Sequence, residues 1–207
     1  MKKTAAIFLF TIIAWQLPAQ QRIIAECTLT YSIAAPDASM DAASAFKASK
    51  KTVYIKGNDC RTDLVSAAFC QTMFYDKTTG NATILREFGT NKFMTKLDNA
   101  KWISENKKFE GLTINYAEEH KTIAGYDCKK ATLQLKDGNS YVLYYTSAIV
   151  PSVKEFEYQF KDIPGLVLSY EAIGEKGDKV KYTATRVNLS PVPNSIFIIP
   201  TSGYRIL

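Results

Sequence analysis

The sequence predicts a mainly β protein: a curved, incompletely closed antiparallel sheet, a half-barrel of about eleven strands, with one or two short helices. Apolar residues recur at every second position through most of the chain, which is the spacing of half-buried strands. Short turns rich in Gly, Asn and Asp separate these stretches. Strands joined in this way form a meander, and a meander that curls toward a barrel protects its edges.

The first half of the domain contains most of the expected strands. Apolar residues alternate from Ile23 to Ile33, which predicts one long first strand. The Ala-rich stretch from Asp37 to Ser49 predicts a short helix. Further strands are expected at residues 52–56, 61–65, 69–75, 82–88 and 92–97.

The second half begins with a short helix. Asp98 is the expected N-cap, the helix continues to Phe109, and Gly111 ends it. Asp137-Gly138 between two apolar runs predicts a tight hairpin. Pro164-Gly165 predicts a turn or a close approach of two backbones. Strands are expected at residues 112–117, around 131–135, and at 141–146, 166–173 and 179–189, followed by an extended Pro-rich tail laid along the domain.

The N-terminal segment has the pattern of a cleaved secretory signal peptide. Lys2 and Lys3 precede an apolar run from Ala5 to Trp15, and the small residue Ala19 follows shortly after. The run covers about 11 residues, whereas a membrane-spanning helix needs about 20. We therefore expect a signal peptide at 1–20, a single β-rich domain at 21–207, and a periplasmic or secreted protein.

The charge of the chain argues against a nucleic-acid partner. The formal net charge is +6, and loss of Lys2 and Lys3 with the signal peptide lowers it by two. The basic residues are scattered among acidic ones, whereas nucleic-acid readers concentrate them on one face or helix. Peripheral contact with an anionic membrane remains an alternative to a simple solvated surface, and the oligomeric state is left open.

Four cysteines follow the signal peptide: Cys27, Cys60, Cys70 and Cys128. None forms a Cys-x-x-Cys pair, and the chain has one histidine, so no metal site is expected. In an oxidising compartment an even count predicts at least one disulfide, although sequence cannot separate the three connectivities. The alternative is that some of them are buried thiols.

The sequence contains little that predicts an enzyme. His120 is the only histidine that could serve as a general base, and no Gly-x-Ser-x-Gly motif is present to expose a serine nucleophile. Cys128 beside Lys129 and Lys130 is the one cysteine in a basic neighbourhood. No phosphate loop, dinucleotide motif or calcium loop is found, so no cofactor is expected. Paired carboxylates from remote parts of the chain remain open.

Three blocks resemble those of a known family. They are Lys121-Thr-Ile-Ala-Gly-Tyr-Asp-Cys-Lys-Lys-Ala131, Tyr145-Thr-Ser-Ala-Ile149 and Ile163-Pro-Gly-Leu-Val-Leu168. In this order and spacing they resemble the GLPGLI family of exported proteins from Bacteroidetes-type bacteria, with Asp162 and Ile163 departing from the motif that names it. The resemblance implies an open curved sheet of the outer-membrane lipoprotein carrier type, with helices over its mouth. It implies no established reaction.

We therefore expect a non-enzymatic envelope protein that binds a hydrophobic or acylated ligand, such as a lipid or an acylated protein, on the concave face of the sheet. Alternation and the inferred fold assign this face five candidate ligand-binding residues: Tyr31, Leu133, Leu168, Tyr170 and Tyr182. A structural or adaptor protein with a filled core is the alternative, and an uncharacterised enzyme is a third. An apolar cavity, a filled interior or a polar cleft would separate the three hypotheses.

Overall fold

A computed structural model describes residues 21–35, 39–173 and 179–207. The predicted signal peptide lies outside these residues. The main sheet contains β2 (Glu26–Ala34), β3 (Lys50–Lys56), β4 (Asp59–Val65), β5 (Cys70–Asp76), β6 (Asn81–Phe88), β7 (Asn91–Leu97), β8 (Thr113–Ile123), β9 (Tyr126–Gln134), β10 (Ser140–Thr146), β12 (Leu166–Ile173), β13 (Lys179–Asn188) and β14 (Arg205–Ile206).

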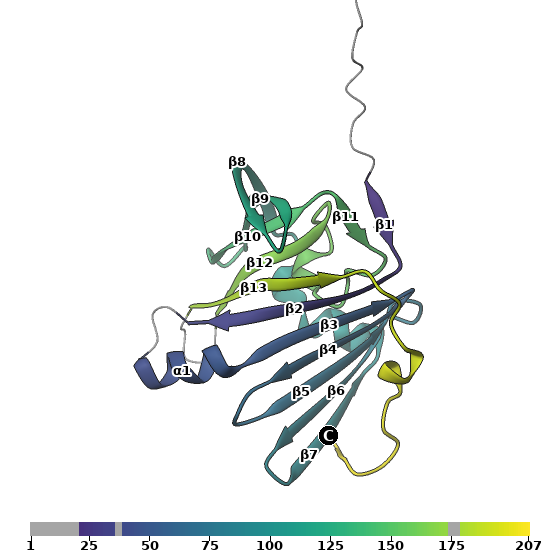
Figure 1. Cartoon of the computed structure of the whole chain (residues 1–207). Helices are drawn as coiled ribbons and strands as arrows, with labels where there is room; N and C mark the ends of the chain where they lie inside the picture. The colour runs from purple at the N-terminus through teal and green to yellow at the C-terminus, as the bar shows by residue number, and fades with distance from the viewer. Residues whose placement is uncertain (1–20, 36–38, 174–178) are drawn as a thin grey trace, which may run out of the picture.

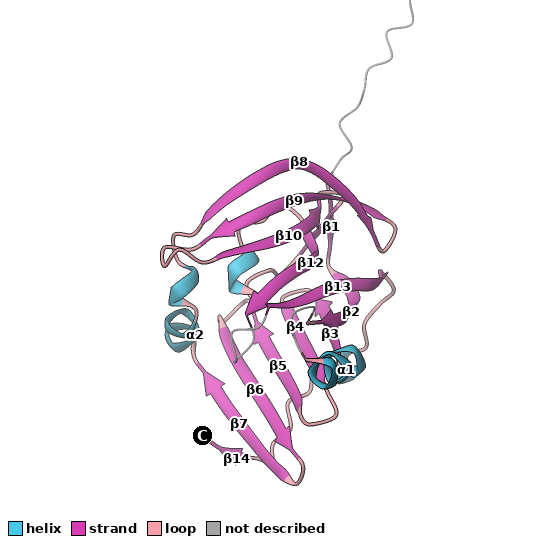
Figure 2. Cartoon of the chain, turned by 90° about the vertical axis from the view of Figure 1, so that its left-hand side faces the viewer, coloured by secondary structure: helices cyan, strands magenta, loops and turns pink. Residues whose placement is uncertain are grey.

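The twelve strands lie in the order β14-β7-β6-β5-β4-β3-β2-β13-β12-β10-β9-β8. All neighbours are antiparallel except β14, which runs parallel to β7. The sheet bends without closing, and its two ends turn toward the side on which α2 (Asn99–Glu105) lies (Figures 1 and 2). The predicted mainly β, curved and incompletely closed sheet is confirmed.

The helices are short. α1 (Met40–Ala48) lies within the predicted Ala-rich stretch, and Asp98 caps α2 by accepting a hydrogen bond from the Lys101 N–H at 2.8 Å, as expected. α2 ends before Phe109 because the side chain of Asn106 donates to the Trp102 carbonyl at 2.9 Å and a separate 3-10 turn, η1 (Lys107–Phe109), follows. Two more 3-10 turns are η2 (Tyr158–Phe160) and η3 (Asn194–Phe197). No described helix is long and apolar enough to cross a membrane.

The expected first strand is divided in two. β1 (Arg22–Ile24) leaves the main sheet and pairs in parallel with β11 (Ile149–Pro151), a strand that the sequence did not predict. β8 is also longer than expected, since it continues to Ile123. Alternation identifies extended chain but carries no information about the partner strand, and β1 and β11 are separated by more than a hundred residues.

The Pro164-Gly165 turn makes the close approach that the sequence predicted. A Cβ atom on Gly165 would lie 2.1 Å from the carbonyl oxygen of Thr146, far inside contact distance. Thr146 ends β10 and Gly165 immediately precedes β12, the adjacent antiparallel strand. Glycine therefore lets these two strands meet at the beginning of their pairing.

The register of the strands divides the side chains of β2 to β7 between a concave and a convex face. The C-terminal segment covers part of the convex face, where Arg61 donates to the Ile196 carbonyl at 2.8 Å and Tyr204 donates to Glu87. On the concave face, paired residues form three rows across the strands. The inner row is Cys27, Ile55, Cys60, Tyr75, Ala82 and Leu97; the middle row is Leu29, Val53, Thr62, Met73, Ile84 and Thr95; the outer row is Tyr31, Lys51, Leu64, Gln71, Arg86 and Phe93.

The predicted disulfide is not found, because all four cysteines are free thiols. Cys27 and Cys60 face the same side, but both pair with Ile55 on the strand between them. Two strand spacings are about 10 Å, beyond the roughly 7 Å between Cα atoms that a disulfide spans. Cys70 points to the convex face and Cys128 lies in β9. Three of the four thiols are buried, as in the alternative that some of the cysteines are buried thiols.

Candidate ligand-binding site on the concave face

The concave face is covered in one half by a segment of the chain that we call the plug, residues 152–165. It follows β11, crosses the face and returns to β12. Its apolar side chains are buried against the sheet: Val153 (0% exposed), Phe156 (7%), Phe160 (5%) and Ile163 (0%). Burying each such side chain stabilises the fold by about 1.5 to 3 kcal/mol. The plug is therefore part of the hydrophobic core.

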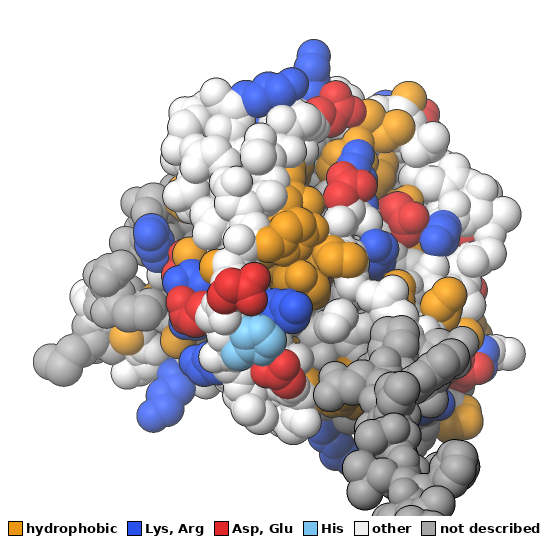
Figure 3. All heavy atoms as spheres, turned by 90° about the horizontal axis from the view of Figure 1, so that it is seen from above, with side chains coloured by type: hydrophobic (Ala, Val, Ile, Leu, Met, Phe, Trp, Pro, Cys, Tyr) orange, Lys and Arg blue, Asp and Glu red, His pale blue; other side chains and the backbone are white. Residues whose placement is uncertain are grey.

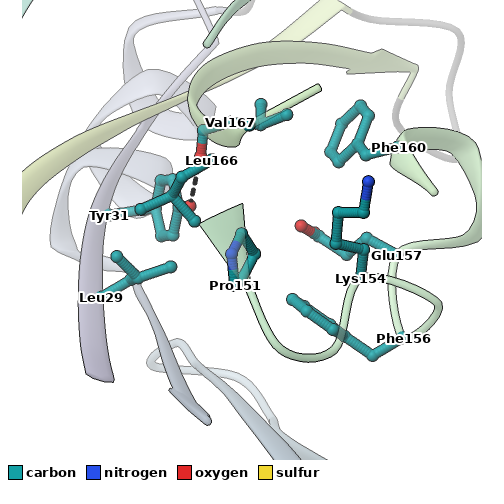
Figure 4. Close-up of a pocket in the computed structure, with 10 residues that line it drawn as sticks. Leu29, Tyr31, Pro151, Lys154, Phe156, Glu157, Phe160, Leu166 and Val167 are labelled. Atoms are coloured by element: carbon teal, nitrogen blue, oxygen red, sulfur yellow. Dashed lines mark hydrogen bonds between the residues drawn. The ribbon is translucent and has the colours of Figure 1, made fainter. Parts of the chain in front are cut away.

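Little space remains between the plug and β2, whereas a cavity of about 110 Å³ lies on the other side of Phe160, beside Leu133 and Tyr141. The cavity between Leu29, Tyr31, Phe156 and Leu166 has a volume of about 20 Å³, enough for roughly one water molecule (Figure 4). The Tyr31 hydroxyl donates to the Val167 carbonyl at 2.7 Å across this gap. The space between the plug and β2 is therefore filled, and a ligand of acyl-chain size has no room at that place.

A buried polar cluster lies where the plug meets the outer row. The Lys51 ammonium forms an ion pair with Glu157 of the plug and donates to the Tyr170 hydroxyl at 2.6 Å. The side chains of Lys51 and Glu157 are 9% and 12% exposed. Taking both charges out of water costs several kcal/mol each, so such a pair is stable only while both partners are in place. The ion pair therefore holds the plug against β3.

Three tyrosines surround the Lys51 ammonium. Its nitrogen lies 5.7, 5.1 and 5.5 Å from the ring centroids of Tyr31, Tyr170 and Tyr182, within the range of cation–π attraction. Tyr170 and Tyr182 are stacked with centroids 4.7 Å apart. Burial, together with the nearby Glu157 charge, raises the pKa of Tyr31 and of Tyr170 well above the ordinary value of 10.0. Both hydroxyls therefore remain protonated hydrogen-bond donors.

The other half of the concave face is not covered by the plug. The middle and outer rows are buried at β2 and β3 but only partly buried from β4 to β7. At one corner, Phe46 of α1 and Leu64 of β4 both pack against the small buried cluster of Ile33, Ala35 and Val180. Phe69 and the 46% exposed Phe88 stack at the margin, with ring centroids 5.9 Å apart. We call this surface the open patch; its members are Thr62, Leu64, Gln71, Met73, Ile84, Arg86, Phe88, Phe93 and Thr95.

The charges on the two faces of β2 to β7 differ in kind. The concave face carries only two charged side chains, Lys51 and Arg86, and no carboxylate from these strands. Lys51 is neutralised by Glu157, whereas Arg86 has no carboxylate partner among the described residues and donates from Nε to the Gln71 side chain at 3.0 Å. The convex face mixes both signs, for example in the Arg61–Asp63 pair at 2.9 Å.

The predicted ligand-binding residues all lie in strands of the main sheet, but not on the open patch. Tyr31, Leu133, Leu168 and Tyr170 are buried, at 2%, 1%, 0% and 5% exposed. Tyr182 is partly buried and stacks on Tyr170. The structure brings the three tyrosines together around Lys51 and places the two leucines in the core, where Leu133 also lines the cavity of about 110 Å³ beside Phe160.

Sequence reasoning missed Lys51, Arg86 and Glu157. Two of them could have been found, because alternation through Val53 and Ile55 places Lys51 on the same face, and alternation through Ala82 and Ile84 does the same for Arg86. A charged residue in an apolar alternating run is the signal. Glu157 lies in an irregular segment and has no such signal.

Cys128 and His120, the two reactive side chains singled out from the sequence, form no hydrogen bond with each other in the described part of the chain. Burial raises the pKa of the Cys128 thiol to about 11, so it is not an activated thiolate. His120 lies in β8 on the surface, with its ring nitrogen 2.8 Å from the Asp127 carboxylate (Figure 3). No cluster of three or more His, Cys, Asp or Glu side chains suited to a metal ion occurs in the described part of the chain.

No protein-family model matches the chain, and no curated protein matches it in sequence. Among solved structures, PNGF-II is 14% identical over 87% of this chain and 30% of its own length, with a TM-score of 0.47. The Pseudomonas aeruginosa MucA/MucB complex contains a chain that is 11% identical over 84% and 56%, with a TM-score of 0.44. A LolA superfamily protein from Nitrosomonas europaea is 13% identical over 84% and 90%, with a TM-score of 0.34. These are weak similarities of fold, and the chain spans about 30% of the length of PNGF-II.

Proposed function

We propose that this protein is an exported, non-enzymatic binding protein of the cell envelope, and that it holds a hydrophobic or acylated ligand on the open patch. Export rests on the charge order of residues 1–20, and the resemblance to the GLPGLI family agrees with it. The observation that carries the proposal is the composition of the patch. Leu64, Met73 and Ile84 remain partly exposed on the concave side of a sheet whose equivalent positions at β2 and β3 are fully buried.

The proposal differs from the sequence-based expectation in location. A ligand between the plug and β2, where the cavity is about 20 Å³, would have to displace buried core residues of the plug such as Phe156 and Phe160. A ligand on the open patch would cover the concave face at β4 to β7, next to the part at β2 and β3 that the plug covers. The plug and the ligand would then lie side by side on one continuous face. Aromatic residues at the margin suit this role because a ring contacts an acyl chain while its edge remains near water.

A pair of matched variants tests the proposal. Phe88 is 46% exposed on the concave side and Val65 is 48% exposed on the convex side, so Asp at either site costs little folding stability. We expect Phe88→Asp to weaken uptake of a fluorescent fatty-acid probe about tenfold and Val65→Asp to leave it unchanged. Thermal melts of both variants serve as the folding control.

The test also addresses the alternative of a structural or adaptor protein. The buried plug and the cavity of only about 20 Å³ between it and β2 favour that alternative. An adaptor takes up no probe in a well-folded wild-type sample. Uptake that both variants reduce equally would likewise contradict binding at the open patch.

A further inference from the structure

Arg86 differs from the other cations of the sheet in its surroundings. It is partly buried on the concave face, next to Ile84 and Phe88 along β6 and opposite Phe93 on β7. A guanidinium carries five N–H donors, and the structure assigns one of them, Nε–H, to the Gln71 amide oxygen. No described carboxylate lies within ion-pair distance of it. By contrast, Arg61 on the convex face is paired with Asp63 and also donates to a backbone carbonyl.

The Gln71 contact orients the guanidinium. Holding Nε fixes the plane of the group and leaves the two terminal nitrogens as a fork, the geometry that matches a carboxylate or a phosphate. Arg86 lies in the outer row, near the end of β6. Met73 and Ile84 lie in the middle row, between Arg86 and the inner row, where Tyr75 packs against Trp102 of α2. The charged group of Arg86 therefore lies near the margin of the open patch, and the apolar side chains of Met73 and Ile84 lie further in.

Resting on the proposed function, we infer that the ligand of the open patch is an anionic amphiphile whose phosphate or carboxylate headgroup binds Arg86 and whose acyl chain lies over Met73 and Ile84. Strands β2 to β7 place no Asp or Glu on the concave face, so they present no carboxylate that would repel such a headgroup. The second concave cation, Lys51, is already occupied by Glu157, so Arg86 is the anchoring group.

A series of dodecyl amphiphiles tests the inference in the wild-type protein. Displacement of a neutral naphthylamine probe would be measured for dodecyl phosphate, laurate, dodecyl maltoside and dodecyltrimethylammonium. We expect the two anions to bind about tenfold more tightly than the neutral maltoside and the cation to bind most weakly. If the maltoside binds as tightly as the anions, the headgroup assignment is wrong while the proposed function stands. Absence of binding by every amphiphile contradicts the proposed function itself.

Matched variants then locate the headgroup. Arg86→Gln should remove the preference for anions and leave maltoside affinity unchanged, whereas Lys96→Gln removes the same charge from the convex face of β7 and should change neither. Arg86→Lys should keep part of the preference, because it retains the charge without the fork. Equal losses for anionic and neutral amphiphiles in Arg86→Gln would show a packing role and overturn the inference. Displacement by inorganic phosphate alone would identify a site for free anions and also overturn it.

Discussion

The two halves of the concave face are made of consecutive antiparallel strands with the same alternation, β2 and β3 in one half and β4 to β7 in the other, yet one is core and the other is surface. At the middle row, Leu29 and Val53 are 1% and 0% exposed, while Met73 and Ile84 remain partly exposed. The difference is the plug, which lies about a hundred residues further along the chain. An alternating strand pattern therefore predicts which side chains share a face but not whether that face is covered.

The largest expected effect comes from breaking the connection between the plug and the sheet. Lys51→Met leaves the Glu157 carboxylate buried without its cation, and we expect a loss of about 3 to 5 kcal/mol in the free energy of unfolding. Urea denaturation measures it. The double variant Lys51→Met, Glu157→Leu should recover most of that loss, because it buries no unpaired charge. A single variant as stable as wild type would show that the pair does not hold the plug.

A comparison of two isoleucines sharpens the contrast between the halves. Ile163→Ala in the plug empties space around a side chain that is 0% exposed, and we expect a cost of about 3 to 4 kcal/mol. Ile84→Ala on the open patch should cost about 1 kcal/mol, because that side chain already contacts solvent. Both values come from urea denaturation midpoints at fixed m-value. Equal costs would mean that the open patch is as well packed as the covered half.

The smallest expected effect depends on pH. Burial by itself raises the pKa of Glu155 in the plug, but hydrogen bonds from the Lys154 backbone N–H and the charge of Lys77 outweigh it and lower the pKa below the ordinary 4.5. The stabilisation is therefore present above that value and is lost as pH falls through the folded-state pKa. Since Glu155 is 35% exposed, screening limits it to about 0.5 kcal/mol.

Glu155→Gln tests this contribution. The variant should be less stable than wild type near neutral pH and equally stable in acid, with the two curves of unfolding midpoint against pH converging below the ordinary carboxyl pKa. A difference that persists unchanged into acid would assign the contribution to packing and not to the carboxylate charge.

Local features of the fold were predictable from the sequence. The Asp98 cap, the Asp137-Gly138 turn and the strand alternation depend on neighbouring residues, and the structure contains all three. The sequence also predicted a close backbone approach at Pro164-Gly165, but it did not predict that the neighbouring residue is Thr146. Errors arose where an element depends on a distant partner, as with β1 and β11.

The sequence by itself determined the type of fold and which residues of a strand share a face, so that Tyr31, Lys51 and Arg86 each fall on the same face as apolar residues of their own strand. Only the tertiary structure decided which of the two cations, Lys51 or Arg86, is paired with a carboxylate of the chain. Glu157 reaches Lys51 from 106 residues away, through an irregular segment with no periodic pattern, and leaves Arg86 without a carboxylate. Local patterns arise from backbone geometry that repeats along the chain, whereas the pairing of distant charges depends on where the whole chain folds back on itself.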